Sequence, residues 1–191
     1  LEQGITSFTL YEKADRVGGT WRDNTYPGAA CDVPSHLYSF SFAPKVDWTR
    51  KFPEQPEILD YLERLVDEHD LGPHIQFATE VTAATWIAER SLWSLELRRA
   101  NTDSGVDDQE ATDGGSGQVQ HSEAEIVVSG LGQLNRPNVP QIPGLESFTG
   151  TMFHSAAWDH EHVLSGERVA VIGIGASAIQ FVPQVAAKAA T

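Results

Sequence analysis

The chain has 191 residues, with 27 acidic and 13 basic side chains and a formal net charge of −14 at pH 7. This length allows one or two domains with a sizeable core, and the negative charge disfavours a nucleic-acid partner. The single cysteine, Cys31, excludes an internal disulfide framework and is typical of a reducing compartment. No apolar run is long enough to span a membrane and no signal peptide is recognisable, so we expect a cytoplasmic protein.

The chain begins with a pattern typical of a helix end followed by a strand. Gly4 closes residues 1–4 as a helix C-cap glycine would, and Ile5–Tyr11 predicts a strand that ends at Glu12. In a dinucleotide-binding βαβ unit, an acidic residue at the end of the second strand hydrogen-bonds a ribose, and the glycine turn lies about 20 residues earlier. We therefore expect a strand, a glycine loop and most of a helix before Leu1; the alternative for Glu12 is a solvated strand end.

A tight glycine turn, Gly18–Trp21, leads into a long loop over residues 24–42 that is rich in aromatic residues and proline. A loop this apolar is expected to pack against a flat surface instead of lying in solvent. By itself, Asp32 would be a turn residue that hydrogen-bonds nearby backbone. Cys31 is interpreted as a small buried filler, because nothing around it argues for a lowered thiol pKa.

The next segment predicts a helix that belongs to the core. Prolines and acidic residues from Pro53 to Glu57 favour a helix start. Apolar residues then recur at helical spacing as far as Val66, and Leu71-Gly72-Pro73 ends the helix.

From residue 75 the apolar period changes from helical to alternating. Residues 76–87, 92–98 and 124–129 are predicted as three strands of a small antiparallel meander. Trp93, Leu95 and Leu97 would face one side of the second strand, and Ile126–Val128 would be the buried run of the third. Residues 101–122, which are rich in Asp, Gly, Ser and Gln, are expected to form a solvated, mobile hairpin tip.

A proline- and glycine-rich crossover over residues 130–144 is followed by a strand–turn–helix pattern. Residues 169–172 predict a buried strand, and Ala176–Ala190 predict a helix that Pro183 should kink. Between them lies the pattern G-x-G-x-x-A, in which Gly173 tightens the turn, Gly175 lets backbone approach phosphate, and Ala178 keeps helix and strand close. The helix start at Ala176 and Ser177 supplies free N–H groups to an anion; an ordinary strand–helix turn is the alternative.

A rarer pattern, F-x-G-x-x-x-H-x-x-x-W, lies between the crossover and this turn and comprises Phe148, Gly150, His154 and Trp158. With the turn, it resembles the fingerprint of the Baeyer–Villiger monooxygenases, within the larger group of flavin-containing monooxygenases. The motifs G-G-T-W, Y-P-G-A-x-C-D and S-x-S-F in residues 18–42 recur in the same family.

The resemblance implies that the protein uses FAD and NADPH. It implies that Glu12 holds the FAD ribose, that the Gly18–Trp21 turn lines the flavin, and that Asp32 lies beside nicotinamide and flavin and orients a catalytic arginine expected after residue 191. The cofactor-binding residues predicted in this way are Glu12, Gly19, Thr20, Trp21, Asp32, Tyr38, Val81 against the adenine, and Gly173, Gly175, Ala176, Ser177 and Ala178.

No metal is expected, because His154 has no second ligand at zinc spacing. The resemblance implies that His154 and its motif couple the linker to domain position, and the plainer interpretation is a buried, hydrogen-bonded histidine that braces Trp158.

These patterns predict an α/β fold of two Rossmann-like dinucleotide-binding domains, both incomplete, with a small antiparallel meander inserted in the first. Residues 1–136 would be the partial FAD-binding domain with its meander at about 76–130, residues 137–166 the linker with the fingerprint, and residues 167–191 the start of the NADP-binding domain.

The implied reaction consumes NADPH and dioxygen and inserts one oxygen atom, through a C4a-peroxyflavin, into a small organic ketone or aldehyde. Two alternatives remain open: an N- or S-oxidising relative, and an inactive nucleotide-fold fragment if the chain stands alone. A disulfide-reductase-like flavoprotein is disfavoured, because it needs a redox cysteine pair and the chain has one cysteine.

Overall fold

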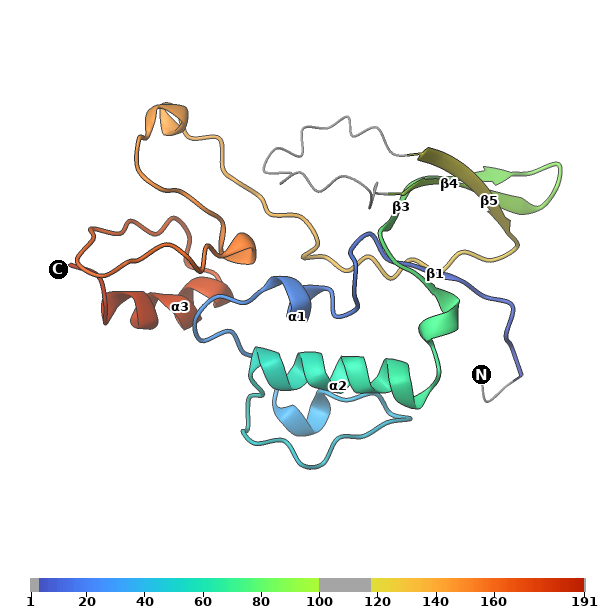
Figure 1. Ribbon diagram of the computed structural model, residues 1–191, viewed down its shortest axis with the longest axis horizontal. Coiled ribbons are helices and arrows are strands. Elements are labelled where there is room, and N and C mark those ends of the chain that lie inside the picture. Colours follow the sequence, from blue (N-terminus) through green and yellow to red (C-terminus); the bar gives the residue numbers. More distant parts are fainter. Residues whose placement is uncertain (1–3, 100–117, 191) are drawn as a thin grey trace. The chain divides into compact units, whose positions relative to one another are not determined.

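The structure, a computed structural model, describes residues 4–99 and 118–190, which belong to two compact units. One unit comprises Leu1–Val17 and Val66–Leu131, and the other comprises Gly18–Leu65 and Gly132–Thr191. Figure 1 shows the chain coloured along its sequence. The helix end predicted before Gly4 lies outside the described residues, as does the hairpin tip up to residue 117.

In the first unit, two short strands form a parallel pair. Strand β1 (Leu10–Tyr11) lies beside β2 (Ile75–Gln76), which follows the 3-10 turn η2 (Gly72–His74). The predicted strand over residues 5–11 is therefore confirmed only at its end, and Ile5 is 63% exposed. The physical reason is that, among the described residues, only the last two positions have a partner strand.

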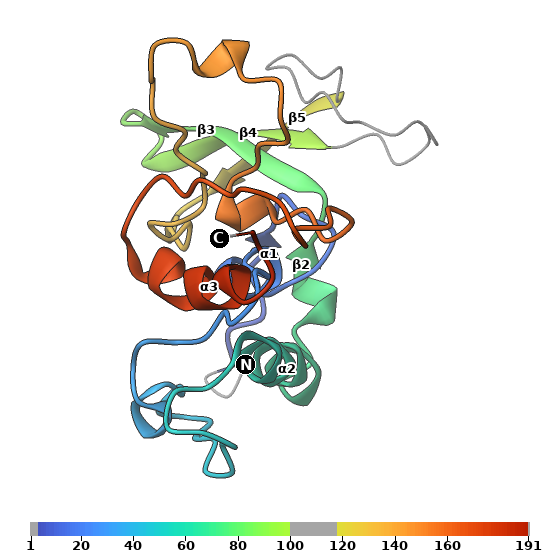
Figure 2. The same cartoon turned by 90° about the vertical axis from the view of Figure 1, so that its left-hand side faces the viewer.

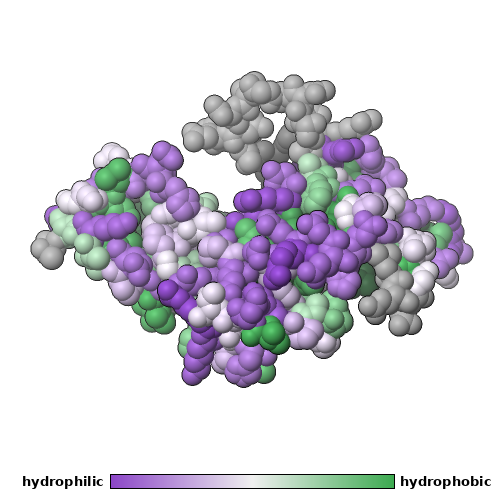
Figure 3. Space-filling model, turned by 60° about the horizontal axis from the view of Figure 1, so that its bottom comes forward, coloured by the Kyte–Doolittle hydropathy of each residue, from purple (hydrophilic) through white to green (hydrophobic). Residues whose placement is uncertain are grey.

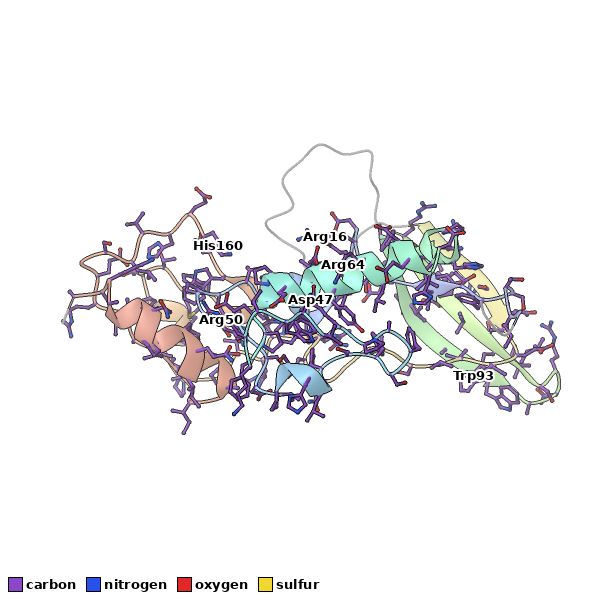
Figure 4. The ribbon with its side chains drawn as sticks, turned by 90° about the horizontal axis from the view of Figure 1, so that it is seen from below. Arg16, Asp47, Arg50, Arg64, Trp93 and His160 are labelled. Carbon is purple, nitrogen blue, oxygen red and sulfur yellow. The ribbon has the colours of Figure 1, made fainter. Side chains whose placement is uncertain are left out.

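The antiparallel meander is present, as predicted. Its order is β3 (Thr79–Ile87), β4 (Leu92–Arg99) and β5 (Gln118–Ala124), with Leu95 and Leu97 buried on the central strand. A register shift between Val81 and Ala83 interrupts the β3–β4 ladder. Trp93 pairs with Trp86 across the two strands and extends from β4 near the hairpin (Figure 4).

The third strand lies earlier in the chain than predicted. Residues 118–122, expected in the hairpin tip, belong to β5, whereas Ile126 and Val128 are 79% and 86% exposed and lie outside any strand. Trp93 pairs with Ala124, and β4 begins only one residue before Trp93. Residues 126–128 therefore lie past the end of β4 and have no residue of that strand to pair with.

The second unit contains residues 55–65 of helix α2 (Gln55–Glu68), and these supply its main buried face, as their spacing predicted. Ile58, Tyr61 and Leu65 are all buried. The Tyr61 hydroxyl donates to the Ala43 carbonyl at 2.8 Å and accepts from the Phe40 N–H at 2.9 Å. Part of the aromatic loop therefore packs on α2, although Phe42 stays 65% exposed.

The same unit contains α1 (Thr20–Asp23), α3 (Ala176–Ala186) and the single 3-10 turns η1 (Ser35–Leu37), η3 (Leu145–Ser147) and η4 (Ser155–Ala157). Helix α3 starts where predicted, ends before Ala190 and contains Pro183. Figure 2 shows it beside the segment that carries η4.

The buried strand predicted over residues 169–172 is not formed. These residues lie outside any strand, and Val169, Val171 and Ile172 are 40%, 39% and 64% exposed. A strand needs a neighbour that satisfies its backbone groups, and none of the described strands pairs with this segment. The structure thus has mixed helices and sheets, but its only parallel ladder among the described residues is β1–β2.

The displayed surface in Figure 3 is mostly hydrophilic, with the apolar residues in separate small patches. Among the described residues, no helix is both long enough and apolar enough to cross a membrane.

Candidate functional site

The glycine turn before α3 is open, and no side chain caps the helix start that follows it. Gly173 has φ +117°, in the region that favours glycine, and Gly175 is the N-cap of α3 with no side chain capping it. A Cβ placed on either glycine would meet nothing within 4 Å. Because the first N–H groups of a helix have no partner within it, the start of α3 at Ala176, Ser177 and Ala178 can receive an anion.

Gln180, on the next turn of α3, binds the loop that precedes Asp32. Its Oε1 accepts from the Tyr26 hydroxyl at 2.9 Å and from the Ala30 N–H at 3.3 Å, while its Nε2 donates to the Ala30 carbonyl at 2.8 Å. A Cβ on Gly28, which has φ +82°, would lie 3.0 Å from the Gln180 carbonyl oxygen, so the close approach requires glycine there. Gln180 was not among the predicted site residues; a polar residue between the apolar Ile179 and Phe181, one turn past the glycine motif, was the available signal.

The aromatic ring of Phe181 joins the fingerprint to this loop. The Trp158 ring centroid lies 5.3 Å from that of Phe181 and 5.1 Å from that of Phe153, and Phe181 packs edge-on against Tyr26 at 5.9 Å. These are favourable distances for aromatic pairs. The fingerprint tryptophan is thereby held on the helix that follows the glycine turn.

The remaining fingerprint residues shape their own backbone. Phe148 folds over Gly150 so closely that a Cβ there would lie 2.6 Å from the ring. His154 is half-buried and not fully buried as the plainer interpretation expected. Its Nδ1 accepts from the Ala156 N–H at 3.0 Å and so caps η4. Nearby in sequence, Nε2 of His160, labelled in Figure 4, lies 2.8 Å from the Thr25 hydroxyl.

The Gly18–Trp21 turn places an aromatic pair in the same unit. Gly18 and Gly19 have φ +114° and +49°, and Thr20 and Trp21 begin α1. The Trp21 Nε1–H donates to the Tyr38 hydroxyl at 3.0 Å, and the two rings meet edge-on at 5.8 Å. Gln55 Nε2 also donates to the Trp21 carbonyl. Two of the predicted cofactor-binding residues, Trp21 and Tyr38, are therefore in contact.

Burial raises two pKa values beside this pair. It raises the pKa of the Cys31 thiol, with the nearby Asp32 charge acting in the same direction. It also raises the pKa of Tyr38, which the hydrogen bond from Trp21 partly offsets. Asp32 itself is exposed. Both Cys31 and Tyr38 are therefore neutral at neutral pH, and the negative charge of this group is that of Asp32.

Two predicted residues, Glu12 and Val81, lie in the other unit. Glu12 directly follows the parallel pair: its N–H donates to the Gln76 carbonyl at 3.0 Å, and its Oε1 accepts from the Ala14 N–H at 2.9 Å. Val81 lies on β3 opposite Leu97 and is 37% exposed. Glu12 therefore lies at the carboxyl end of a parallel strand, as the sequence predicted.

The part of the chain that the structure describes comprises residues 4–99 and 118–190. Within these ranges, no group of three or more His, Cys, Asp or Glu side chains could hold a metal ion.

Comparison with known proteins identifies the family. The model of the flavin-binding monooxygenase-like family matches residues 1–191. A Baeyer–Villiger monooxygenase of Streptomyces coelicolor is 48% identical over 186 residues, which are 97% of this chain and 32% of the relative. The chain therefore belongs to the flavin-binding monooxygenase-like family.

Solved structures agree with this assignment. The polycyclic ketone monooxygenase of Thermothelomyces thermophila matches 98% of this chain and 30% of its own, with a TM-score of 0.82 and 32% identity. An oxidized steroid monooxygenase bound to NADP matches 98% of this chain and 33% of its own, with a TM-score of 0.78 and 38% identity. The chain spans about a third of the length of the relatives it matches.

Proposed function

We propose that the full-length protein is an FAD- and NADPH-dependent monooxygenase that inserts one oxygen atom of O2 into a ketone or aldehyde. The observation that carries this proposal is the turn of residues 173–178: two glycines, an open approach and an uncapped helix start. Such a turn suits the pyrophosphate of a dinucleotide. The family assignment gives that dinucleotide its chemical partner, a flavin.

Names of relatives support the cofactors and the substrate class. The family is described as flavin-binding, and the steroid monooxygenase was solved with NADP. The Streptomyces relative is named a Baeyer–Villiger monooxygenase, and the fungal structure is a polycyclic ketone monooxygenase. We infer from these names that this protein acts on a carbonyl compound, and from the resemblance that its fold is built from Rossmann-like halves.

Different residues of this chain would then bind different parts of NADPH and FAD. Gly173, Gly175, Ala176, Ser177 and Ala178 would receive the NADPH pyrophosphate through backbone N–H groups. Glu12 would accept hydrogen bonds from the FAD ribose, as an acid at the end of a parallel strand can. Val81 would lie against the adenine of FAD. The aromatic pair Trp21–Tyr38 and the turn at Gly19 and Thr20 would line the flavin.

Bound FAD would supply the redox chemistry: it would take two electrons from NADPH and use O2 to place one oxygen atom in the carbonyl substrate, with the other oxygen atom leaving as water. The chain's own residues would position the groups that bind in the site. Asp32 would place a negative charge that holds a cationic group in the site. Trp21 donates its N–H to Tyr38, so that the neutral hydroxyl keeps a fixed orientation. The Trp158–Phe181 contact would keep the fingerprint on the dinucleotide helix while NADPH binds.

The test is NADP⁺ binding to the full-length, FAD-loaded protein by calorimetry, with Gly175→Val as the variant. A valine would fill the space that the pyrophosphate needs, so we expect the Kd to rise by about tenfold or more, which corresponds to about 1.4 kcal/mol. Gly130→Val is the matched control, since a Cβ at Gly130 also meets nothing within 4 Å but lies outside the turn. Equal NADP⁺ affinity in all three proteins would reject residues 173–178 as the binding turn.

A further inference from the structure

The side-chain amide of Gln180 holds one short stretch of backbone with both of its polar atoms. Ala30 donates its N–H to Oε1 and accepts from Nε2 at its carbonyl, at 3.3 and 2.8 Å. The Tyr26 hydroxyl adds a third bond at 2.9 Å. Because a planar amide presents donor and acceptor in a fixed arrangement, this pairing sets the register of residues 26–30 against α3.

Two further contacts hold the same loop on the same helix. The Phe181 ring packs on Tyr26, and Gly28 lies against the Gln180 carbonyl, where any larger residue would meet backbone at 3.0 Å. Asp32 follows Ala30 by two residues, and Cys31 between them is buried. The Gln55 N–H donates to the Ala29 carbonyl and the Cys31 N–H donates to the Pro53 carbonyl, both at 2.9 Å. The position of Asp32 therefore depends on residues 53–55 on one side of this stretch and on Gln180 of α3 on the other.

Gln180 lies one turn beyond the start of α3. The first helical bond runs from the Ile179 N–H to the Gly175 carbonyl, so Gln180 follows the turn that would receive a pyrophosphate without touching it. An anion bound to the first N–H groups restrains that turn of helix. Such a restraint would reach residues 26–30 chiefly through the three hydrogen bonds of the Gln180 amide, with the Phe181–Tyr26 contact beside them.

We propose that Gln180 is a positioning residue that couples dinucleotide binding at residues 173–178 to the order of residues 26–32. The inference rests on the proposed function, because it takes the start of α3 as the NADPH site. Coupling of this kind is reciprocal: the bound dinucleotide stabilises the loop, and the clamped loop strengthens dinucleotide binding by the same factor.

The test measures amide hydrogen exchange in the full-length, FAD-loaded protein, on a peptide that covers residues 26–32, with and without saturating NADP⁺. In the unaltered protein, NADP⁺ should slow exchange by about fivefold or more. Gln180→Leu keeps a similar side-chain size but removes all three bonds. It should abolish the slowing caused by NADP⁺ and raise the Kd for NADP⁺ by the same factor.

Matched variants separate coupling from a merely structural role. Gln184→Leu makes the same change at an exposed position of α3 and should retain both the slowing and the affinity. Tyr26→Phe removes one bond of three and should give intermediate values. A merely structural Gln180 would speed exchange equally with and without NADP⁺ and leave the effect of the dinucleotide unchanged, which would overturn the coupling.

The outcomes also separate this inference from the proposed function. An FAD-loaded wild type that binds no NADP⁺ would overturn both. A wild type that binds NADP⁺, together with a Gln180→Leu variant that keeps the full NADP⁺-dependent slowing, would overturn only the coupling. Loss of the slowing in Gln180→Leu, with Gln184→Leu unaffected, supports it.

Discussion

Gly18 shows how one residue without a side chain sets up the aromatic pair. Its φ of +114° is strained for other residues, and a Cβ there would lie 2.5 Å from Cδ1 of Leu59 on α2. The following residues begin α1, which carries Trp21 to its contact with Tyr38. The turn therefore packs directly on the main helix of its unit, and its sequence is restricted for steric reasons as well as for any contact with a cofactor.

Gly18→Ala should destabilise the protein by about 1–3 kcal/mol, because it combines backbone strain with overpacking against Leu59. The change is measured by urea unfolding followed by tryptophan fluorescence. Gly72→Ala is the control: a Cβ there meets nothing within 4 Å, and its φ lies outside the strained range. Equal stability of the two variants would show that Gly18 is not packed as described.

The raised pKa values of Cys31 and Tyr38 predict how stability changes at high pH. Each neutral form is favoured in the folded state, so the contribution is complete below the ordinary values of 9.0 and 10.0 and is lost as pH rises through the raised values. Unfolding free energy should therefore decline above about pH 9. Tyr38→Phe should make the decline shallower, and an identical pH profile for this variant would contradict the burial of Tyr38.

Cys31 should also react slowly with iodoacetamide. A buried thiol with a raised pKa has little thiolate at pH 8, and thiolate is the reacting form. Mass spectrometry of the peptide that carries Cys31 should show alkylation at least about tenfold slower than in the urea-unfolded protein. Equal rates in folded and unfolded protein would show that the thiol is accessible and unperturbed.

At the scale of elements, α3 is the helix on which the loop and the fingerprint meet. Gln180 and Phe181, adjacent in sequence, both contact Tyr26, and Phe181 also contacts Trp158. Ala178 and Val185 supply its buried positions. The fingerprint's large aromatic residue thus acts in packing, and its histidine caps a turn.

Phe181→Ala should cost about 1–3 kcal/mol, less than the 3–5 kcal/mol typical of a fully buried phenylalanine, because the ring is half-buried. Ile179→Ala, two residues earlier and 72% exposed, should change stability by at most about 0.5 kcal/mol. Thermal unfolding of both variants measures the difference. A larger loss for Ile179→Ala would mean that α3 presents a different face to its unit.

Helices and strands differed in how far sequence predicted them. The starts of α2 and α3 follow from local signals, a proline–acid turn and a glycine pair, and both helices begin within two residues of expectation. Residues 169–172 and 126–128 have strong strand propensity but belong to no strand, because pairing depends on a neighbour that local sequence does not specify. Gln180 was missed for a similar reason: its partners lie about 150 positions away in sequence.

At the scale of the whole molecule, short motifs predicted the family, whereas apolar periodicity predicted only individual helices and strands. Five short motifs identified the monooxygenase family, which the match over residues 1–191 confirms. The individual site residues and domain boundaries stay predictions. Among them, Trp21 and Tyr38 are in contact, whereas Glu12 and Val81 belong to the other compact unit.

The most direct test of the proposed monooxygenase function follows the fate of dioxygen. The full-length, FAD-loaded protein is incubated with NADPH, ¹⁸O2 and a cyclic ketone, with methyl phenyl sulfide in a parallel reaction, and the products are analysed by mass spectrometry. We predict a lactone that carries one ¹⁸O atom and NADPH consumption that requires the ketone. Sulfoxide without lactone would assign the protein to the S-oxidising alternative. A flavin that NADPH does not reduce, together with no ¹⁸O-labelled product, would contradict the proposed monooxygenase function.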